Sequence, residues 1–147
     1  MLARNGFVMI ERAHPGGYFS RRAEAEAILE RILRDLAQME IDFIISSGNG
    51  TFIDDAESQA VRQIVPKAVV YTAKPALGES IGASGLWQII LAAQALRSKE
   101  IPPVLHAEHS VGLRISVSRM TIASARRAIV LSCGVNQQTA GLRLAIQ

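Results

Sequence analysis

Cysteine and histidine are scarce in this sequence. Cys133 is the single cysteine among 147 residues, and there are only three histidines. One cysteine excludes an intramolecular disulfide framework, so a reducing compartment fits best, and we expect the cytoplasm. The scattered histidines and the lone cysteine show no metal-ligand spacing, and we therefore predict no metal site.

Aromatic residues, charge runs and long apolar runs are also lacking. Aromatics make up 5% of the chain, and the 16 basic residues are spread along it with no lysine-rich block. A net charge of +3 without a basic patch argues against a nucleic-acid-binding protein. The apolar run near the N-terminus is too short for a signal-peptide core or a membrane span, so we expect no membrane association.

The apolar content, in contrast, is high. Hydrophobic residues make up 49% of the sequence and charged residues 20%. A chain of this length and composition buries a real core, and there is no internal repeat or low-complexity tract. We predict one domain spanning residues 1–147.

Apolar periodicity in the first half predicts strands that alternate with helices. Ser20 is the expected N-cap of the first helix, and Asp54 or Asp55 that of the second. The predicted elements, in chain order, are a buried strand (7–10), a loop (14–17), a helix (21–39), a strand (41–46), a helix ending at residue 65 and a strand (68–72).

The second half predicts the longest helix, over residues 80–99, and a closing hairpin. That helix is apolar on nearly all sides, so we expect it to be central and buried. Residues 104–124 read as a loop with one strand at 113–117. Two apolar runs, at 128–133 and 142–146, follow as the hairpin. Together these elements predict an α/β fold with a largely buried mixed sheet.

Three polar turns could carry chemistry. The turn at 46–51 has glycines around a polar residue after a buried strand, which allows close backbone approach to a ligand. The turn at 74–85 leads small residues into a helix N-terminus, which suits an anionic or polar ligand. The third is the loop at 131–139. An ordinary glycine turn is the simpler explanation of the first, whereas close helix packing explains the second equally well.

No catalytic pair is evident from residue types alone. Cys133 lies in the third loop, but the sequence supplies no obvious base to form its thiolate, so we interpret it as a structural thiol. His14, His106 and His109 fall in predicted loops outside the three turns. We expect them at the surface.

In this order, the three turns resemble the C-terminal half of β-ketoacyl synthases, the condensing enzymes of fatty-acid and polyketide assembly. Residues 47–51, Ser-Gly-Asn-Gly-Thr, are similar to the family's His-Gly-Thr-Gly-Thr, with Asp55 at the place of an acid that follows. Residues 74–85 match its Lys-Ser-x-x-Gly-His-x-x-Gly-Ala-Ala-Gly, and residues 101–105 its Ile-Pro-Pro-Thr-Leu. The loop at 131–139 weakly echoes its final Asn-Ser-Phe-Gly-Phe-Gly-Gly-x-Asn. The resemblance covers residues 20–147.

The resemblance implies one βαβαβαββ lobe of the thiolase fold, a mixed sheet with helices that a partner chain completes. In the family this unit is duplicated, and the nucleophilic cysteine belongs to the N-terminal half. A lone lobe would expose a large apolar face. The resemblance therefore implies a hetero-oligomer with an N-terminal half or a full ketosynthase subunit, and an acyl carrier protein as a further partner.

The family's two histidines are replaced here by Ser47 and Glu79. Those histidines donate hydrogen bonds during decarboxylation, whereas an ionised glutamate only accepts them and opposes a developing enolate. Removing one such donor costs on the order of 3 kcal/mol of transition-state stabilisation, so we expect no useful catalysis. The resemblance leaves Asn49, Thr51, Lys74 and Val135 as ligand-binding positions. Val135 stands for a gating phenylalanine, and Gln88 for a helix glutamate.

Three functions stay open at this point. The first is a non-catalytic ketosynthase-like subunit, comparable to a chain length factor, which shapes the acyl tunnel or docks the carrier protein. It would use no cofactor beyond the carrier protein's phosphopantetheine arm. The second is a split acyltransferase or thioester-processing enzyme with Glu79 as base. Its nucleophilic cysteine would lie on another chain. The third is a degenerate fragment without a function.

Overall fold

One mixed sheet with helices on both faces forms the framework. The computed structural model describes residues 6–48, 50–80, 82–105, 118–134 and 136–147. Its five main strands run in the order β1-β7-β6-β2-β3. They are β1 (Val8–Tyr18), β2 (Phe43–Ile45), β3 (Val69–Tyr71), β6 (Arg127–Cys133) and β7 (Gln138–Ile146). β2 is parallel to β3 and β6, whereas β7 is antiparallel to both β6 and β1. The α/β class, the mixed sheet and the closing hairpin are confirmed.

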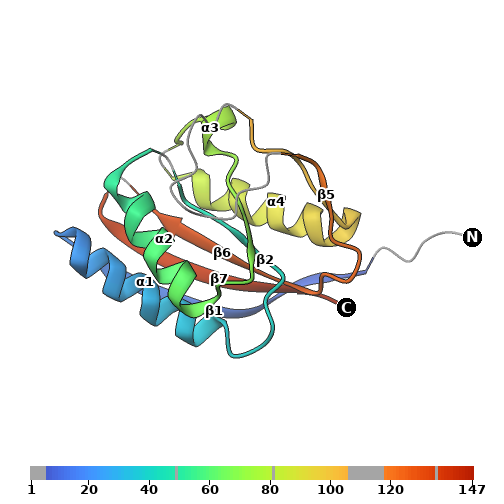
Figure 1. Cartoon of the computed structure of the whole chain (residues 1–147), viewed down its shortest axis with the longest axis horizontal. Helices are drawn as coiled ribbons and strands as arrows, with labels where there is room; N and C mark the ends of the chain where they lie inside the picture. Colours follow the sequence, from blue (N-terminus) through green and yellow to red (C-terminus); the bar gives the residue numbers. More distant parts are fainter. Residues whose placement is uncertain (1–5, 49, 81, 106–117, 135) are drawn as a thin grey trace, which may run out of the picture.

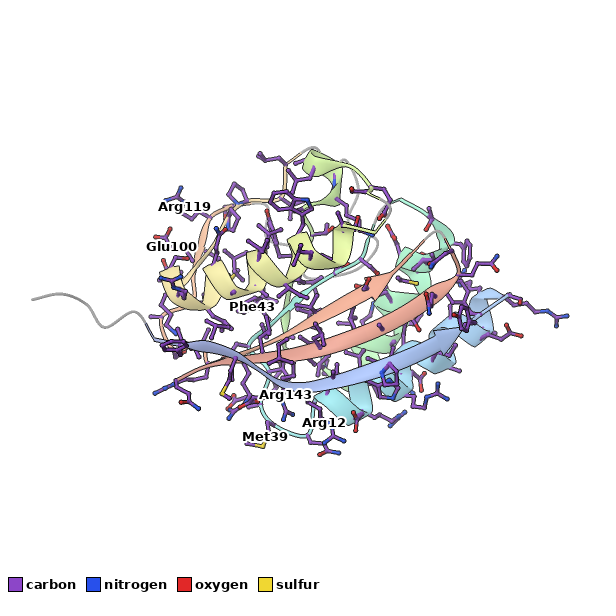
Figure 2. All side chains as sticks on the ribbon, turned by 180° about the vertical axis from the view of Figure 1, so that it is seen from behind. Arg12, Met39, Phe43, Glu100, Arg119 and Arg143 are labelled. Atoms are coloured by element: carbon purple, nitrogen blue, oxygen red, sulfur yellow. The ribbon has the colours of Figure 1, made fainter. Side chains whose placement is uncertain are left out.

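The helices divide unequally between the two faces of the sheet (Figure 1). On one face, α1 (Arg22–Leu36) and α2 (Phe52–Ile64) pack together over a closed core. Among the described residues, the other face carries a single long helix, α4 (Ser84–Ser98). Phe43 lies buried between α4 and the sheet (Figure 2). The two sides of the sheet are therefore closed to different degrees.

The N-terminal strand corrects two predictions. β1 runs through the predicted loop at 14–17, with a register shift between His14 and Gly17. Gly16 has φ +73, and a Cβ there would lie 1.8 Å from the Thr139 carbonyl oxygen, so only glycine fits beside β7. The segment at 7–10 is not buried, since Ile10 is 55% exposed. β1 is an edge strand, so it pairs with β7 alone. Its backbone hydrogen bonds hold it to the sheet while most of its side chains stay exposed.

Both predicted helix caps are shifted. α1 begins after Arg21, and Glu24 accepts hydrogen bonds from the backbone N–H groups of Ser20 and Arg21 at 2.7 and 3.2 Å. α2 is capped by Thr51, whose hydroxyl accepts from the Ile53 N–H at 3.4 Å. In α1 the capping side chain is thus Glu24, at the third helical position, whereas in α2 it is Thr51, which directly precedes the first helical residue.

The segment after β3 holds an additional short helix, α3 (Lys74–Leu77), and α4 then starts four residues later than predicted. α4 is not fully buried, since Leu86 is 61% and Trp87 53% exposed. Two short strands that the sequence did not indicate, β4 (Glu100–Ile101) and β5 (Met120–Thr121), form a separate antiparallel ladder. The predicted strand at 113–117 lies outside the described residues.

Candidate functional site

The second and third turns meet in one pocket at the carboxyl end of the parallel strands. The second turn follows β3 and the third follows β6, and these ends share one edge of the sheet. The pocket has a volume of about 370 Å³. Its lining includes Lys74, Glu79 and Ser84 from the second turn and Cys133 and Asn136 from the third. Ligand sites of open α/β sheets form at such edges.

The first turn is connected to this edge, but its described residues do not line the pocket. Ser47 is fully buried, and its hydroxyl and backbone N–H both donate to Glu57 Oε2, at 2.5 and 3.2 Å. The Thr72 hydroxyl donates to the Gly48 carbonyl at 3.0 Å, which joins the turn to the end of β3. The one hydroxyl proton of Ser47 is thus committed to Glu57.

Glu57 is a buried acid beneath the first turn. Its side chain comes from α2, and Oε1 has no hydrogen-bond partner within the part of the chain that the structure describes. Burial raises the pKa of Glu57, while the hydrogen bonds from Ser46 and Ser47 and the Ser47 backbone lower it to a smaller extent. The turn therefore rests on a carboxyl that is pushed toward its neutral form.

Glu79, at the second histidine position, is engaged on both of its oxygens. Lys74 Nζ lies 2.7 Å from Glu79 Oε2, and the Ser84 hydroxyl donates to Glu79 Oε1 at 2.7 Å. The Lys74 side chain is only 7% exposed, so this ion pair is partly shielded from water. A carboxylate held in this way offers no hydrogen-bond donor toward the pocket, and its charge is already balanced.

Cys133 lies in the lining, but it is a poor nucleophile. It is buried, and burial together with the negative charge of Glu57 raises its pKa to about 12. At neutral pH the thiol is therefore fully protonated, whereas the reactive form of cysteine is the thiolate. The interpretation of Cys133 as a structural thiol agrees with this environment.

Gln88 ties two of the strand ends together. Its Nε2 donates to the carbonyl oxygens of Ser46 and Leu131, both at 2.8 Å, so one amide bridges the ends of β2 and β6. Gln88 is 4% exposed, and its Oε1 has no hydrogen-bond partner among the described residues. A neutral amide supplies two donors here, whereas the carboxylate at this position in the family pattern would face two carbonyl oxygens.

The remaining predicted positions fare differently. Lys74 lies in the pocket, whereas Thr51 caps α2 outside it. Asn49 and Val135 lie outside the described residues. Asp54, and not Asp55, holds the first turn, because its carboxylate accepts from the Gly50 N–H at 2.8 Å. Asp55 instead pairs with Arg22 at 3.2 Å on the surface.

Sequence reasoning missed Glu57 and Ser84. A signal for Glu57 existed, because it falls between Ile53 and Val61 at four-residue spacing, on the buried face of α2. Ser84 gave no such signal, since its pairing with Glu79 depends on how the second turn folds. In the described part of the chain no group of three or more histidine, cysteine and acidic side chains could hold a metal ion. No described helix is long and apolar enough to cross a membrane.

Comparisons with known proteins agree with this architecture. Residues 6–108 match the family model "Beta-ketoacyl synthase, C-terminal domain". The 3-oxoacyl-[acyl-carrier-protein] synthase 2 of Mycobacterium leprae is 34% identical over 108 residues, which are 71% of this chain and 25% of that protein. The Mycobacterium tuberculosis protein of the same name is 35% identical over the same shares. The matched part thus spans a quarter of these relatives.

Solved structures give the same result. The ishigamide ketosynthase/chain length factor superposes with a TM-score of 0.70 at 26% identity, covering 97% of this chain and 36% of that one. An oxazolomycin ketosynthase domain from Streptomyces albus has a TM-score of 0.75 at 18% identity, over 95% of this chain and 30% of that one. The predicted resemblance is confirmed: the chain belongs to the β-ketoacyl synthase family and corresponds to the C-terminal half of its thiolase-type fold.

Proposed function

We propose that this chain is a non-catalytic ketosynthase-like subunit of a fatty-acid or polyketide condensing complex. It completes or pairs with an active ketosynthase, and it shapes the acyl tunnel or docks the acyl carrier protein. The membership of the condensing-enzyme family supports the general setting. The likeness to a ketosynthase/chain length factor pair is compatible with an accessory role.

One observation carries the non-catalytic part of the proposal. Glu79 takes the place of a hydrogen-bond donor. One of its oxygens accepts a hydrogen bond from Lys74 and the other accepts one from Ser84. Ser47, at the other donor position, donates its hydroxyl hydrogen bond to Glu57. Decarboxylation needs donors aimed at the developing oxyanion, and each lost donor costs on the order of 3 kcal/mol. Neither position supplies one.

The ligand of the proposed subunit is the phosphopantetheine arm of a carrier protein. Lys74 and the hydroxyl-bearing residues around it supply polar contacts in a pocket whose lining is otherwise largely apolar, which suits an amide-containing arm. Asn49, Thr51 and Val135 are the other positions that the family pattern assigns to ligand contact. No bound cofactor or metal is needed for this role.

The test measures decarboxylation of a malonyl thioester by a purified full-length ketosynthase, with and without this chain. We expect no decarboxylation by the chain alone. In the mixture, Glu79→Gln and the matched control Glu40→Gln, an exposed acid far from the pocket, should leave the rate unchanged. Co-elution of the chain with the ketosynthase or with an acyl carrier protein supports the subunit role.

Two results would overturn the proposal. If the mixture loses activity with Glu79→Gln but not with Glu40→Gln, Glu79 acts as a base. The split acyltransferase or thioester-processing function then replaces the subunit role. If the chain binds neither protein and changes no rate, it has no place in a condensing complex.

A further inference from the structure

The edge strand β1 carries a bulge where it passes the candidate site. The pairing of β1 with β7 shifts between His14 and Gly17. Within the bulge, Gly16 has φ +73, and its backbone lies so close to β7 that a Cβ would approach the Thr139 carbonyl oxygen to 1.8 Å. Because the two strands are pressed together at this point, a change in the bulge also displaces Thr139.

The bulge forms part of the pocket wall. Pro15 lines the pocket of about 370 Å³ at the candidate site and also an open groove of about 360 Å³ beside α4. Thr139 lines the same pocket, and its hydroxyl donates to the Gly17 carbonyl at 3.3 Å. The conformation of the bulge therefore sets the shape of the wall between the pocket and the groove.

A side-chain contact within the bulge holds its backbone. The Gly16 N–H donates to His14 Nδ1 at 2.9 Å. A side-chain acceptor that binds the N–H two residues later has the pattern of an Asx turn, here with an imidazole nitrogen in place of a carbonyl oxygen. Nδ1 accepts only while the ring is neutral, because both ring nitrogens are donors in the imidazolium ion. The contact therefore exists in one protonation state of His14 and is lost in the other.

The surroundings of His14 supply a partner for the charged ring. The charged side chains that contact β1 from other elements are Arg31 and Asp35 on α1, Arg127 on β6 and Arg143 on β7. Residues 84–96 of α4 carry none. Asp35 is the one acid of this set. The hydrogen bond from Arg12 lowers the pKa of Asp35 most, and the positive charge of His14 also lowers it, so Asp35 is ionised where histidine titrates.

We propose that His14 makes the wall of the pocket sensitive to pH. In its neutral form, Nδ1 holds the Gly16 N–H and keeps the bulge in the conformation described above. In its protonated form, the ring releases Gly16 and turns to the Asp35 carboxylate. Pro15 and Thr139 then shift in the pocket wall. Histidine changes its charge between about pH 5 and 8, so the change falls in the physiological range. This inference does not depend on the proposed function.

Amide chemical shifts of the whole ¹⁵N-labelled chain, followed from about pH 8 to pH 5, test the proposal. The Gly16 amide proton should move upfield as its hydrogen bond is lost, with the same midpoint as the His14 ring resonances. The Thr139 amide should follow with that midpoint, because it lies against the bulge. Asp35→Asn removes the anion that stabilises the charged ring, so it should lower the midpoint.

The matched variant is His14→Asn, whose side-chain oxygen reaches the same N–H group and does not titrate. In this variant the Gly16 and Thr139 amide shifts should stay constant over the whole range, with a circular dichroism spectrum like that of the wild type. His106 and His109 are the other histidines of the sequence. Replacing both by Gln should leave the titration of the Gly16 amide unchanged.

Four results would overturn the proposal. The first is a Gly16 amide that stays constant while the His14 ring titrates. The second is a titration of Gly16 that persists in His14→Asn, because another group then causes it. The third is a Thr139 amide that does not follow Gly16, since the pocket wall is then independent of the bulge. The fourth is an unchanged midpoint in Asp35→Asn, which would mean that Asp35 does not receive the charged ring.

Discussion

The two faces of the sheet differ in how far the chain closes them. On the α1 and α2 side, large apolar residues such as Leu29, Leu33 and Leu36 are completely excluded from water. On the α4 side, the inner residues are buried while Leu86 and Trp87 on the outer side of the helix are more than half exposed. The helices on the α1 and α2 face bury most of their apolar side chains, whereas α4 buries only the side chains that face the sheet. An apolar surface left outside a finished core indicates contact with another polypeptide.

Glu57 and Glu79 show the same contrast between a closed and an open environment. Glu57, on the closed side, is fully buried and has no basic partner among the described residues, and burial raises its pKa. Glu79 lies at the open pocket and is balanced by Lys74 at 2.7 Å. On the closed side burial thus favours the protonated form of a carboxyl, whereas at the open side an ion pair balances the charged form.

The largest effect should come from truncating the closed core. Leu33→Ala removes a fully buried side chain between α1 and the sheet, and we expect a loss of roughly 2–5 kcal/mol in the free energy of unfolding. The matched control, Leu77→Ala, removes the same atoms from a residue that is 62% exposed and should change it by less than about 0.5 kcal/mol. Urea unfolding measures both. Equal losses would mean that the two faces are not closed differently.

A smaller, pH-dependent effect should come from Glu57. Its folded pKa lies above the ordinary value of 4.5, so the folded chain binds more protons than the unfolded chain once the pH exceeds that value. The free energy of unfolding should therefore fall as pH rises above about 4.5. Glu57→Gln removes this ionisation and should flatten the fall. Urea midpoints between pH 5 and 8 measure it.

The control for that experiment is Glu40→Gln, which changes an exposed acid and should keep the wild-type slope. An identical slope in Glu57→Gln would show that Glu57 ionises freely in the folded chain and would contradict the closed environment of the first turn.

The smallest effect should come from the surface ion pair at the edge of the closed face. Arg12 Nε donates to Asp35 Oδ2 at 2.8 Å, and the Arg12 side chain is 44% exposed. Arg12 projects at the outer side of β1, next to Arg143 (Figure 2). Water and salt screen such a pair, so Arg12→Ala should leave the urea midpoint nearly unchanged, most clearly in 0.5 M salt. A large drop would mean that β1 depends on this pair.

Much of the fold could be predicted because it is encoded locally. The helix of α1 follows from apolar spacing at Ile32, Leu33 and Leu36, and the hairpin follows from two apolar runs around a polar loop. β1 could not be predicted at full length, because its pairing through His14 and Gly17 is made with β7, more than a hundred residues later. Edge strands have little apolar periodicity to detect.

The sequence predicted which residues belong to the candidate site, but it did not predict the contacts that these residues make. The motifs located Ser47, Glu79 and Lys74, and they showed that two hydrogen-bond donors are replaced. They could not show that Ser47 binds Glu57 or that Ser84 closes Glu79, because each of these contacts joins segments whose approach depends on the turns. The sequence also predicted that α4 is buried on all sides, whereas Leu86 and Trp87 on its outer side are more than half exposed.

The sequence by itself determined the α/β lobe, its family and the loss of two histidines, since these depend on residue types, spacing and periodicity along the chain. Only the tertiary structure decided which acid is buried, which is paired, and that apolar side chains on the outer side of α4 are exposed among the described residues. The reason is physical: burial and ion pairing depend on what surrounds a side chain in three dimensions, and residues far apart in sequence supply those surroundings.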